Sequence, residues 1–295
     1  MSALEVSEPD LDVHLLQDGF AIERGVLSAE EIQRLRISLK AYFRLEGKQN
    51  FYGVTQSNAA IKIPDISWIC YHDKILDGVR RSLGTADIMF TSHCDAHVRT
   101  LAQWHKDDGE SSNPGGYFGQ TTYDIPDCRV YKVAVYLQDH RHNRSGLTVR
   151  RGSHRRASLV EGESVCLDTA AGDIVIFDVR LTHRGQTASL PIRMAKRSLN
   201  SLQSAFSKLE SYFPFYSQAK LPNLSFHQAG ERMAIFFTFG LPNTFTQNFA
   251  IANMARQCRE SGCENFLLPP DVRQAFLQKG VLLAEDVFTA SQMGF

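Results

Sequence analysis

The sequence lacks the features that mark membrane, secreted and polyanion-binding proteins. No apolar run approaches the roughly 20 residues that a membrane-spanning helix needs. The first residues are acidic and contain no apolar stretch followed by small residues, so no signal peptide is expected. Lys plus Arg and Asp plus Glu number 32 each, which argues against nucleic acid or an anionic membrane as a partner held by bulk charge.

Cysteine is scarce, and internal repeats are missing. The six cysteines are scattered without a C-x-x-C pair, which in a chain of 295 residues favours reduced thiols over disulfides or a zinc knuckle. We therefore expect a cytoplasmic protein. No low-complexity segment or linker divides the chain, so we expect a single domain over residues 1–295, and the sequence sets no oligomeric state.

Helices are expected at both ends of the chain. Ser28 and Glu31 form a capping box before a run of apolar residues spaced three or four apart. A second amphipathic helix is expected to end at Gly84. The N-terminal helices thus occupy about residues 28–84, and further helices are expected at about 247–280.

Between these helices the pattern changes to that of strands. From residue 86 to 183, short segments rich in Val, Ile, Phe and Tyr alternate with Gly, Asn and Asp turns, and a further strand is expected at 232–240. This spacing is typical of an antiparallel sandwich or barrel, here about residues 86–240. Residues 194–226 interrupt it with a helical composition, and we expect either a lid or a helix packed outside the barrel. The predicted fold is mainly β with flanking helices.

A metal site is suggested by the segment QWHKDDGE at residues 103–110. Alternate residues of a strand point to one face, so His105 and Asp107 can offer an imidazole and a carboxylate to one ion. A facial triad of two histidines and one carboxylate leaves half of an Fe(II) octahedron open. His183 closes a buried-looking strand and is the candidate for the third ligand.

Other interpretations of the histidines stay open at this point. An H-x-D pair arises often by chance, and Asp107 and Asp108 could simply cap a turn while His105 binds a backbone carbonyl. A rival cluster could bind zinc or manganese, or line the same cavity: His93, Asp95 and His97. The remaining histidines are expected in loops. His154 lies in a turn among arginines, which suits a surface or a loop-packing role, and His140 and His142 are expected in a solvated loop.

Four segments in this order resemble the phytanoyl-CoA dioxygenase-like family of Fe(II)/2-oxoglutarate-dependent oxygenases. The similarity covers most of the chain: LLQDGFAIERGVLSAEEIQRLR is similar to the family's opening strand and helix, QWHKDDG to its W-H-x-D segment, SGLTVRRGSHR to its G-S-H turn, and GDIVIFDVRLTHRG to its distal-histidine strand. The resemblance implies a double-stranded β-helix (jelly roll, cupin-like barrel). It also implies that iron is bound by His105, Asp107 and His183, whereas His154 is not a ligand.

The family also binds the far carboxylate of 2-oxoglutarate with an arginine on the strand that follows the distal histidine. A planar guanidinium pairs with a carboxylate through two hydrogen bonds, which lysine cannot do. Arg193 has nearly the usual spacing, but a helix-like or loop-like segment follows it, whereas Arg232 opens a convincing strand. An insertion before that strand explains the departure, so we prefer Arg232. Further candidates for contact with the co-substrate are Thr187, Arg99 and Lys132, and for contact with the substrate Trp104, Tyr117, His93, Phe213 and Phe215.

The resemblance implies a dioxygenase that uses Fe(II), 2-oxoglutarate and O2. It would oxidise, and by default hydroxylate, a C–H bond of a small organic molecule of secondary metabolism, with release of succinate and CO2. Aspartate at position 107 fills a site that a halide would need, so hydroxylation is favoured over halogenation. Two alternatives are a non-catalytic cupin-type binding protein and a metalloenzyme that uses His93, Asp95 and His97.

Overall fold

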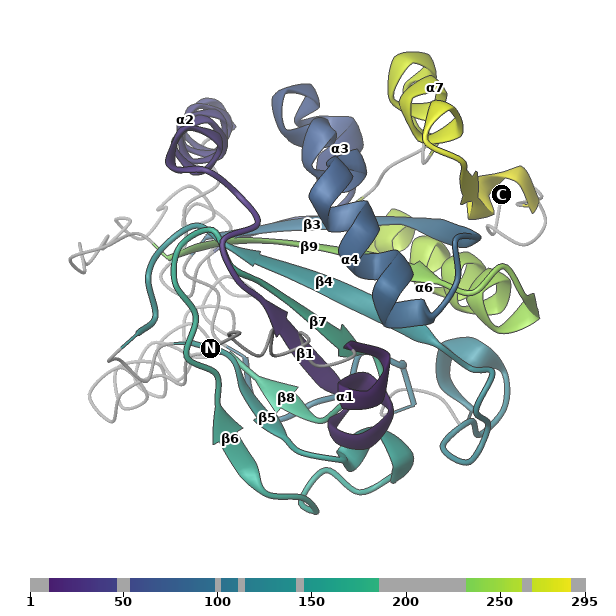
Figure 1. Cartoon of the computed structure of the whole chain (residues 1–295). Coiled ribbons are helices and arrows are strands. Elements are labelled where there is room, and N and C mark those ends of the chain that lie inside the picture. The colour runs from purple at the N-terminus through teal and green to yellow at the C-terminus, as the bar shows by residue number, and fades with distance from the viewer. Residues whose placement is uncertain are drawn as a thin grey trace, which may run out of the picture.

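The computed structural model describes most of the chain outside its two ends and one long segment (Figure 1). The described residues are 11–46, 54–98, 102–110, 115–141, 146–185, 232–261 and 267–287. The segment expected at 194–226 as a lid or outer helix lies outside the described residues.

Two sheets form the body of the protein. The larger has the order β1 (Phe20–Glu23), β7 (Ile174–Asp178), β4 (Val130–Tyr136), β9 (Met233–Gly240), β3 (Ile88–Val98) and β10 (Val281–Leu283), and β2 (Val54–Gln56) also pairs with β3. Its ladders are antiparallel except that between β10 and β3. The smaller has the order β6 (Ser164–Cys166), β5 (Thr148–Arg150) and β8 (His183–Arg184). The mainly β prediction is confirmed, but over the described residues the sheets do not close into a barrel.

Most of the helices cover the outer face of the larger sheet, while the smaller sheet lies against its other face (Figure 1). The helices are α1 (Leu11–Asp18), α2 (Ala29–Leu45), α3 (Ala59–Lys62), α4 (Asp73–Leu83), α6 (Thr244–Ser261) and α7 (Pro270–Gln278), with short 3-10 turns at η1 (Pro64–Tyr71), η2 (Gly116–Phe118), η3 (Ser153–Arg155) and η5 (Ala284–Val287). The helix α6 instead supplies side chains to the inner face. The predicted capping box at Ser28 and the predicted stop at Gly84, where φ is 68°, are both confirmed. No helix in the described part of the chain combines the length and apolarity that crossing a bilayer requires.

Alternation along each strand divides the larger sheet into two environments. On β4, Val133 and Val135 pack with the helices, whereas Ala134 and Tyr136 pack with the apolar residues of the smaller sheet. Lys132 shares the inner face with them because successive side chains of a strand point to opposite faces. Polar groups on this inner face therefore lie between the sheets.

Strand β3 contains an irregularity that determines what it presents to the inner face. Its partner in β9 is Phe239 at Phe90 and Phe237 at Cys94, so an advance of four residues on β3 matches two on β9. The two extra residues form a bulge in which Ser92 has φ 63°, a left-handed conformation that is uncommon for a residue with a side chain. Beyond the bulge, Cys94 packs in the helix-side core, so the residues on either side of it face inward.

The cysteines agree with the expectation of reduced thiols as far as they are described. Five are free, and the sulfur atoms of Cys70 and Cys94 lie 3.7 Å apart in the core. Cys263 lies outside the described residues.

Candidate metal centre and active-site cavity

The H-x-D segment and the distal histidine are brought together by backbone pairing. The amide of His105 donates to the carbonyl of His183 at 2.9 Å, and the amide of His183 donates back at 2.9 Å. Two residues later, the amide of Asp107 donates to the carbonyl of Val179 at 2.8 Å. These bonds fix two segments that are far apart in the sequence side by side, at one end of the smaller sheet.

The three side chains converge on one point. Among the described residues, His105, Asp107 and His183 form a group whose potential ligand atoms all lie within 4.8 Å of one another. Nε2 of His183 is 3.3 Å from Oδ2 of Asp107, and Nε2 of His105 is 3.7 Å from Oδ1. Two imidazole nitrogens and a carboxylate at these separations fit the first shell of one divalent transition metal.

Backbone carbonyls set the orientation of both imidazole rings. Nδ1 of His105 donates to the carbonyl of Gln103 at 2.6 Å, and Nδ1 of His183 donates to the carbonyl of Leu181 at 2.9 Å. A carbonyl oxygen only accepts, so each neutral ring carries its proton on Nδ1 and leaves the Nε2 lone pair toward Asp107. This is the arrangement by which proteins fix the tautomer of a metal-binding histidine.

The electrostatics keep these groups in the protonation states that metal binding requires. Burial, assisted by His183, lowers the pKa of His105 to about 4, so its ring is neutral at pH 7. Burial alone would raise the pKa of Asp107, but Lys132 and His183 outweigh it and hold the pKa well below its usual range. The ammonium of Lys132 is 2.7 Å from Oδ2 of Asp107. Neutral imidazole and ionised carboxylate are the forms that coordinate a cation.

The two acids of the H-x-D segment have different roles, as the alternation predicts. Asp108 accepts from the amide of Glu110 at 3.1 Å and from the hydroxyl of Tyr123 at 3.0 Å. Burial raises the pKa of Asp108. Asp108 therefore supports the turn through hydrogen bonds, and of the two carboxylates it is Asp107 that faces the histidines.

The three side chains line a cavity with a volume of about 660 Å³, within the usual range for small-molecule sites. Four of the predicted co-substrate and substrate contacts also line it: Lys132, Arg232, Tyr117 and His93. Trp104 does not line this cavity, because its ring lies between the guanidinium groups of Arg150, at 4.5 Å, and Arg184, at 4.4 Å. The other predicted contacts lie outside the described residues: Arg193, Thr187, Arg99, Phe213 and Phe215.

Tyr136 is a cavity residue that the sequence interpretation missed. Its side chain is fully buried, and its hydroxyl makes no hydrogen bond among the described residues. The guanidinium of Arg232 lies 5.9 Å from the ring centre. Burial raises the pKa of Tyr136 to about 12 although Arg232 opposes the shift, so the hydroxyl keeps its proton. The sequence could have indicated Tyr136 as a cavity residue, because it follows Lys132 by two strand periods and the two side chains therefore point to the same inner face.

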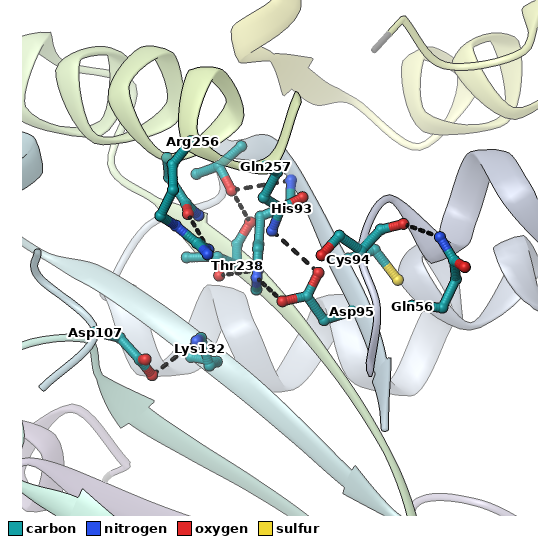
Figure 2. Close-up of polar contacts among 12 residues, drawn as sticks. Gln56, His93, Cys94, Asp95, Asp107, Lys132, Thr238, Arg256 and Gln257 are labelled. Carbon is teal, nitrogen blue, oxygen red and sulfur yellow. Dashed lines mark hydrogen bonds and ion pairs between the residues drawn. The ribbon is translucent and has the colours of Figure 1, made fainter. Parts of the chain in front are cut away.

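The rival cluster lines the same cavity but is bonded internally (Figure 2). Nε2 of His93 lies 3.1 Å from Oδ2 of Asp95, and its Nδ1 lies 2.8 Å from the hydroxyl of Thr238. Because both ring nitrogens of His93 are engaged, neither has a lone pair directed at an ion. The metal-holding group found among the described residues does not include His93, Asp95 or His97, so their use as a zinc or manganese site is not supported.

The structure contradicts the predicted position of one loop histidine and agrees with that of another. His140 was expected in a solvated loop, and this is wrong: its ring is buried against Tyr136 and accepts from the amide of Gln138 at 2.8 Å. His154 is buried in its turn next to Gly19 and does not line the cavity, which agrees with a packing role. His142 lies outside the described residues.

Comparison with known proteins gives matches at the level of structure. No family model matches the chain, and no curated protein matches its sequence. The non-heme alpha ketoglutarate dependent carbocyclase SnoK from nogalamycin biosynthesis is similar, with 16% identity over 81% of this chain and 85% of that chain and a TM-score of 0.53. HygX from Streptomyces hygroscopicus, solved with nickel and 2-oxoglutarate, has 14% identity over 80% and 88% and a TM-score of 0.53.

A third similar structure is EctD from S. alaskensis with 2-oxoglutarate and 5-hydroxyectoine, with 14% identity over 82% of this chain and 79% of that chain and a TM-score of 0.53. At these identities the likeness concerns the fold. The predicted jelly-roll fold is confirmed, with the sheets left open as described above.

Proposed function

We propose that the chain is an Fe(II)- and 2-oxoglutarate-dependent dioxygenase that oxidises, by default hydroxylates, a C–H bond of a small organic molecule. The observation that carries this proposal is the convergence of His105, Asp107 and His183, with both imidazole Nε2 atoms directed at one carboxylate. Two imidazoles and one carboxylate leave an open face on an octahedral metal, which suits Fe(II). When bound, iron and 2-oxoglutarate would supply O2-dependent C–H oxidation coupled to release of succinate and CO2.

The described residues fit such a metal. One oxygen of Asp107 is held by Lys132 at 2.7 Å, while the other lies 3.7 Å from the unprotonated Nε2 of His105. Lys132 would thus keep the carboxylate ionised and fix its plane. The metal would be held by His105, Asp107 and His183, and the carbonyls behind the two rings would keep those rings from turning.

The cavity also fits a dicarboxylate. Arg232 lines it and supplies a planar guanidinium, and the hydroxyl of Tyr136 beside it lacks a hydrogen-bond partner among the described residues. A buried hydroxyl without a partner is costly, and a carboxylate oxygen would satisfy it. Gly185 contributes by its small size, since a Cβ there would come within 3.1 Å of Nη2 of Arg232. We therefore assign the far carboxylate of 2-oxoglutarate to Arg232 and Tyr136.

The remaining walls would shield the reaction and position the substrate. Phe236, Leu147 and Ala234 supply apolar surface, and the ring of Tyr117 lines the cavity next to Gly109. Apolar walls exclude water and strengthen the electrostatic interactions inside the cavity. A role in secondary metabolism is proposed from the resemblance of the sequence to the dioxygenase family, and a cytoplasmic location from the free cysteines.

Anaerobic addition of Fe(II) and 2-oxoglutarate tests the proposal directly. We expect a weak visible charge-transfer band from the chelate and, once air is admitted, release of succinate. A folded protein that gives no band would overturn the proposal. A band without succinate from any candidate substrate would favour the cupin-type binding protein instead.

Substitution distinguishes Arg232 from Arg193 as the residue that binds the far carboxylate of 2-oxoglutarate. Arg232→Ala should weaken 2-oxoglutarate binding by on the order of 100-fold, because it removes the cation that pairs with a buried carboxylate. Arg232→Lys should recover only part of this, since an ammonium cannot form two parallel hydrogen bonds. Titration of the chelate band with 2-oxoglutarate measures the effect. A loss on Arg193→Ala with none on Arg232→Ala would reverse the assignment.

A further inference from the structure

The cavity contains a second carboxylate, that of Asp95, on the inner face of β3. Asp95 is only 9% exposed and lines the cavity. One of its oxygens accepts from the amide of Gln257 at 3.0 Å, and the other lies 3.1 Å from Nε2 of His93 (Figure 2). Thr238, whose hydroxyl meets the other nitrogen of His93, fixes that ring.

The donors around Asp95 are neutral. Burial lowers the pKa of His93 in spite of the neighbouring carboxylate, so its ring carries no charge at pH 7. Burial raises the pKa of Asp95, but the hydrogen bond and charge interaction with His93, assisted by His97 and Lys132, outweigh it, and the pKa lies below its usual value. The carboxylate is therefore ionised, and its charge is not cancelled by its hydrogen-bond partners.

Four other buried or partly buried carboxylates have a basic side chain in contact, whereas buried Asp108 is bonded to an amide and a tyrosine hydroxyl and has a raised pKa. Asp107 pairs with Lys132, Asp178 with Arg180, Asp173 with Arg24 and Glu285 with Arg273, each at 2.7 Å. Among the described residues, the side chain found within ion-pair distance of Asp95 is that of His93, and its ring is neutral. A buried charge is normally paired, so this carboxylate lacks a countercharge that a ligand in the cavity could supply.

The neighbouring cations do not fill this place. The ammonium of Lys132 is engaged with the carboxylate of Asp107 (Figure 2). Arg256 lines the cavity and donates to the amide oxygen of Asn253 at 2.9 Å. Strand β9 lies between β4, which carries Lys132, and β3, which carries Asp95, so the two strands are roughly 10 Å apart.

The residues around Asp95 supply room and an apolar wall. Phe236 is its neighbour across the sheet, and the ring centre of His97 lies 4.9 Å from that of the phenyl ring. His97 lines the cavity, and its ring makes no hydrogen bond to a described residue, so the ring offers a neutral donor or acceptor. Burial lowers the pKa of His97 to about 4, so it adds no competing positive charge.

The backbone of β3 next to Asp95 contains the bulge that directs these side chains to the cavity. The bulge at Thr91–His93, with its left-handed Ser92, brings His93 onto the inner face next to Thr238. Thr91 supports the bulge by donating to the carbonyl of Thr238 at 3.1 Å. Bulges and left-handed residues of this kind occur where a side chain has to be directed to a site.

From these observations we propose that the substrate is an amine-bearing small molecule whose ammonium group binds Asp95, with its apolar body against Phe236 and Tyr136. The inference rests on the proposed function in that the other end of the substrate faces His105, Asp107 and His183. The ammonium group would donate to a carboxylate oxygen, and His97 would accept a further hydrogen bond. No covalent step is involved.

The test uses three probes with one body and different charge: 2-phenylethylamine, its uncharged N-acetyl derivative and 3-phenylpropionate. Isothermal titration is carried out on the protein as purified, and again with Ni(II) and 2-oxoglutarate added. We expect the amine to bind at least about 10-fold more tightly than either other probe, since only it forms a charge-assisted bond with Asp95. Equal affinities, a preference for 3-phenylpropionate, or no binding of the amine would overturn the proposal.

Two variants test whether the preference for the amine depends on the carboxylate of Asp95. Asp95→Asn keeps the shape and removes the charge, so the amine should lose its advantage over the N-acetyl probe. Asp77→Asn, on the exposed face of α4, removes the same charge from the protein and should leave the preference unchanged. A preference that persists in Asp95→Asn would contradict the assignment. The wild-type comparison stands even if Asp95→Asn fails to fold. Because the first titration needs neither iron nor 2-oxoglutarate, failure of the dioxygenase proposal would be seen separately.

Discussion

Replacing Asp107 with alanine is expected to abolish iron-dependent turnover and to weaken Fe(II) binding by more than about 100-fold. Loss of a group that merely supports a ligand costs 10- to 100-fold in metal affinity, and Asp107 is the proposed ligand itself. Its carboxylate also lies between the Nε2 atoms of His105 and His183, so nothing else in the group of three replaces it. Metal titration and succinate release measure the two effects.

The matched control is the neighbouring acid. Asp108→Asn removes the same charge one residue away, from a side chain bonded to the amide of Glu110 and the hydroxyl of Tyr123. Fe(II) affinity should therefore remain close to that of the wild type, although some stability is lost. Asp107→Ala leaves Lys132 without its partner, so the double variant Asp107→Ala/Lys132→Met separates a folding defect from loss of the ligand. Metal binding retained in Asp107→Ala would contradict the assigned triad.

Arg180→Met is expected to give the largest loss of stability, about 3–5 kcal/mol in the free energy of unfolding. Arg180 and Asp178 are 7% and 3% exposed at their side chains and form two parallel bonds, at 2.9 and 2.7 Å. Removing one partner of such a pair leaves an ionised group buried without compensation. Urea denaturation followed by circular dichroism measures the loss.

The same substitution should also disturb the metal centre. Arg180 lies in the turn between β7 and β8, three residues before His183, and its carbonyl accepts a hydrogen bond from Lys106. Replacing both partners, Asp178→Leu with Arg180→Met, should recover much of the lost stability because no charge is then left unpaired. An unchanged urea midpoint for Arg180→Met alone would show that this pair contributes little.

Features encoded by neighbouring residues were predictable from the sequence. The capping box at Ser28 and Glu31 and the glycine stop at Gly84 depend on a few adjacent residues, and the structure confirms both. The strands from β4 to β9 could likewise be placed from their alternation. The H-x-D segment was found because His105 and Asp107 lie two residues apart on one face.

Features that depend on distant pairing were not predictable. The parallel pairing of β10 with β3 joins segments nearly two hundred residues apart and has no local signal. The burial of His140 depends on contacts with Tyr136 and Thr169, which its polar sequence neighbourhood does not reveal. Likewise, the missing hydrogen-bond partner of Tyr136 becomes visible only once the sheets are assembled.

The bulge in β3 also restricts how this site can change over generations. Because it adds two residues, and not one, Asp95 keeps the same side of the strand that it would have without the bulge. Loss of a single residue between Phe90 and Cys94 would exchange the faces, turning Asp95 into the helix-packed core and Cys94 toward the cavity. Descendants of this chain can therefore lengthen or shorten the segment in steps of two, and single-residue steps should be purged by selection.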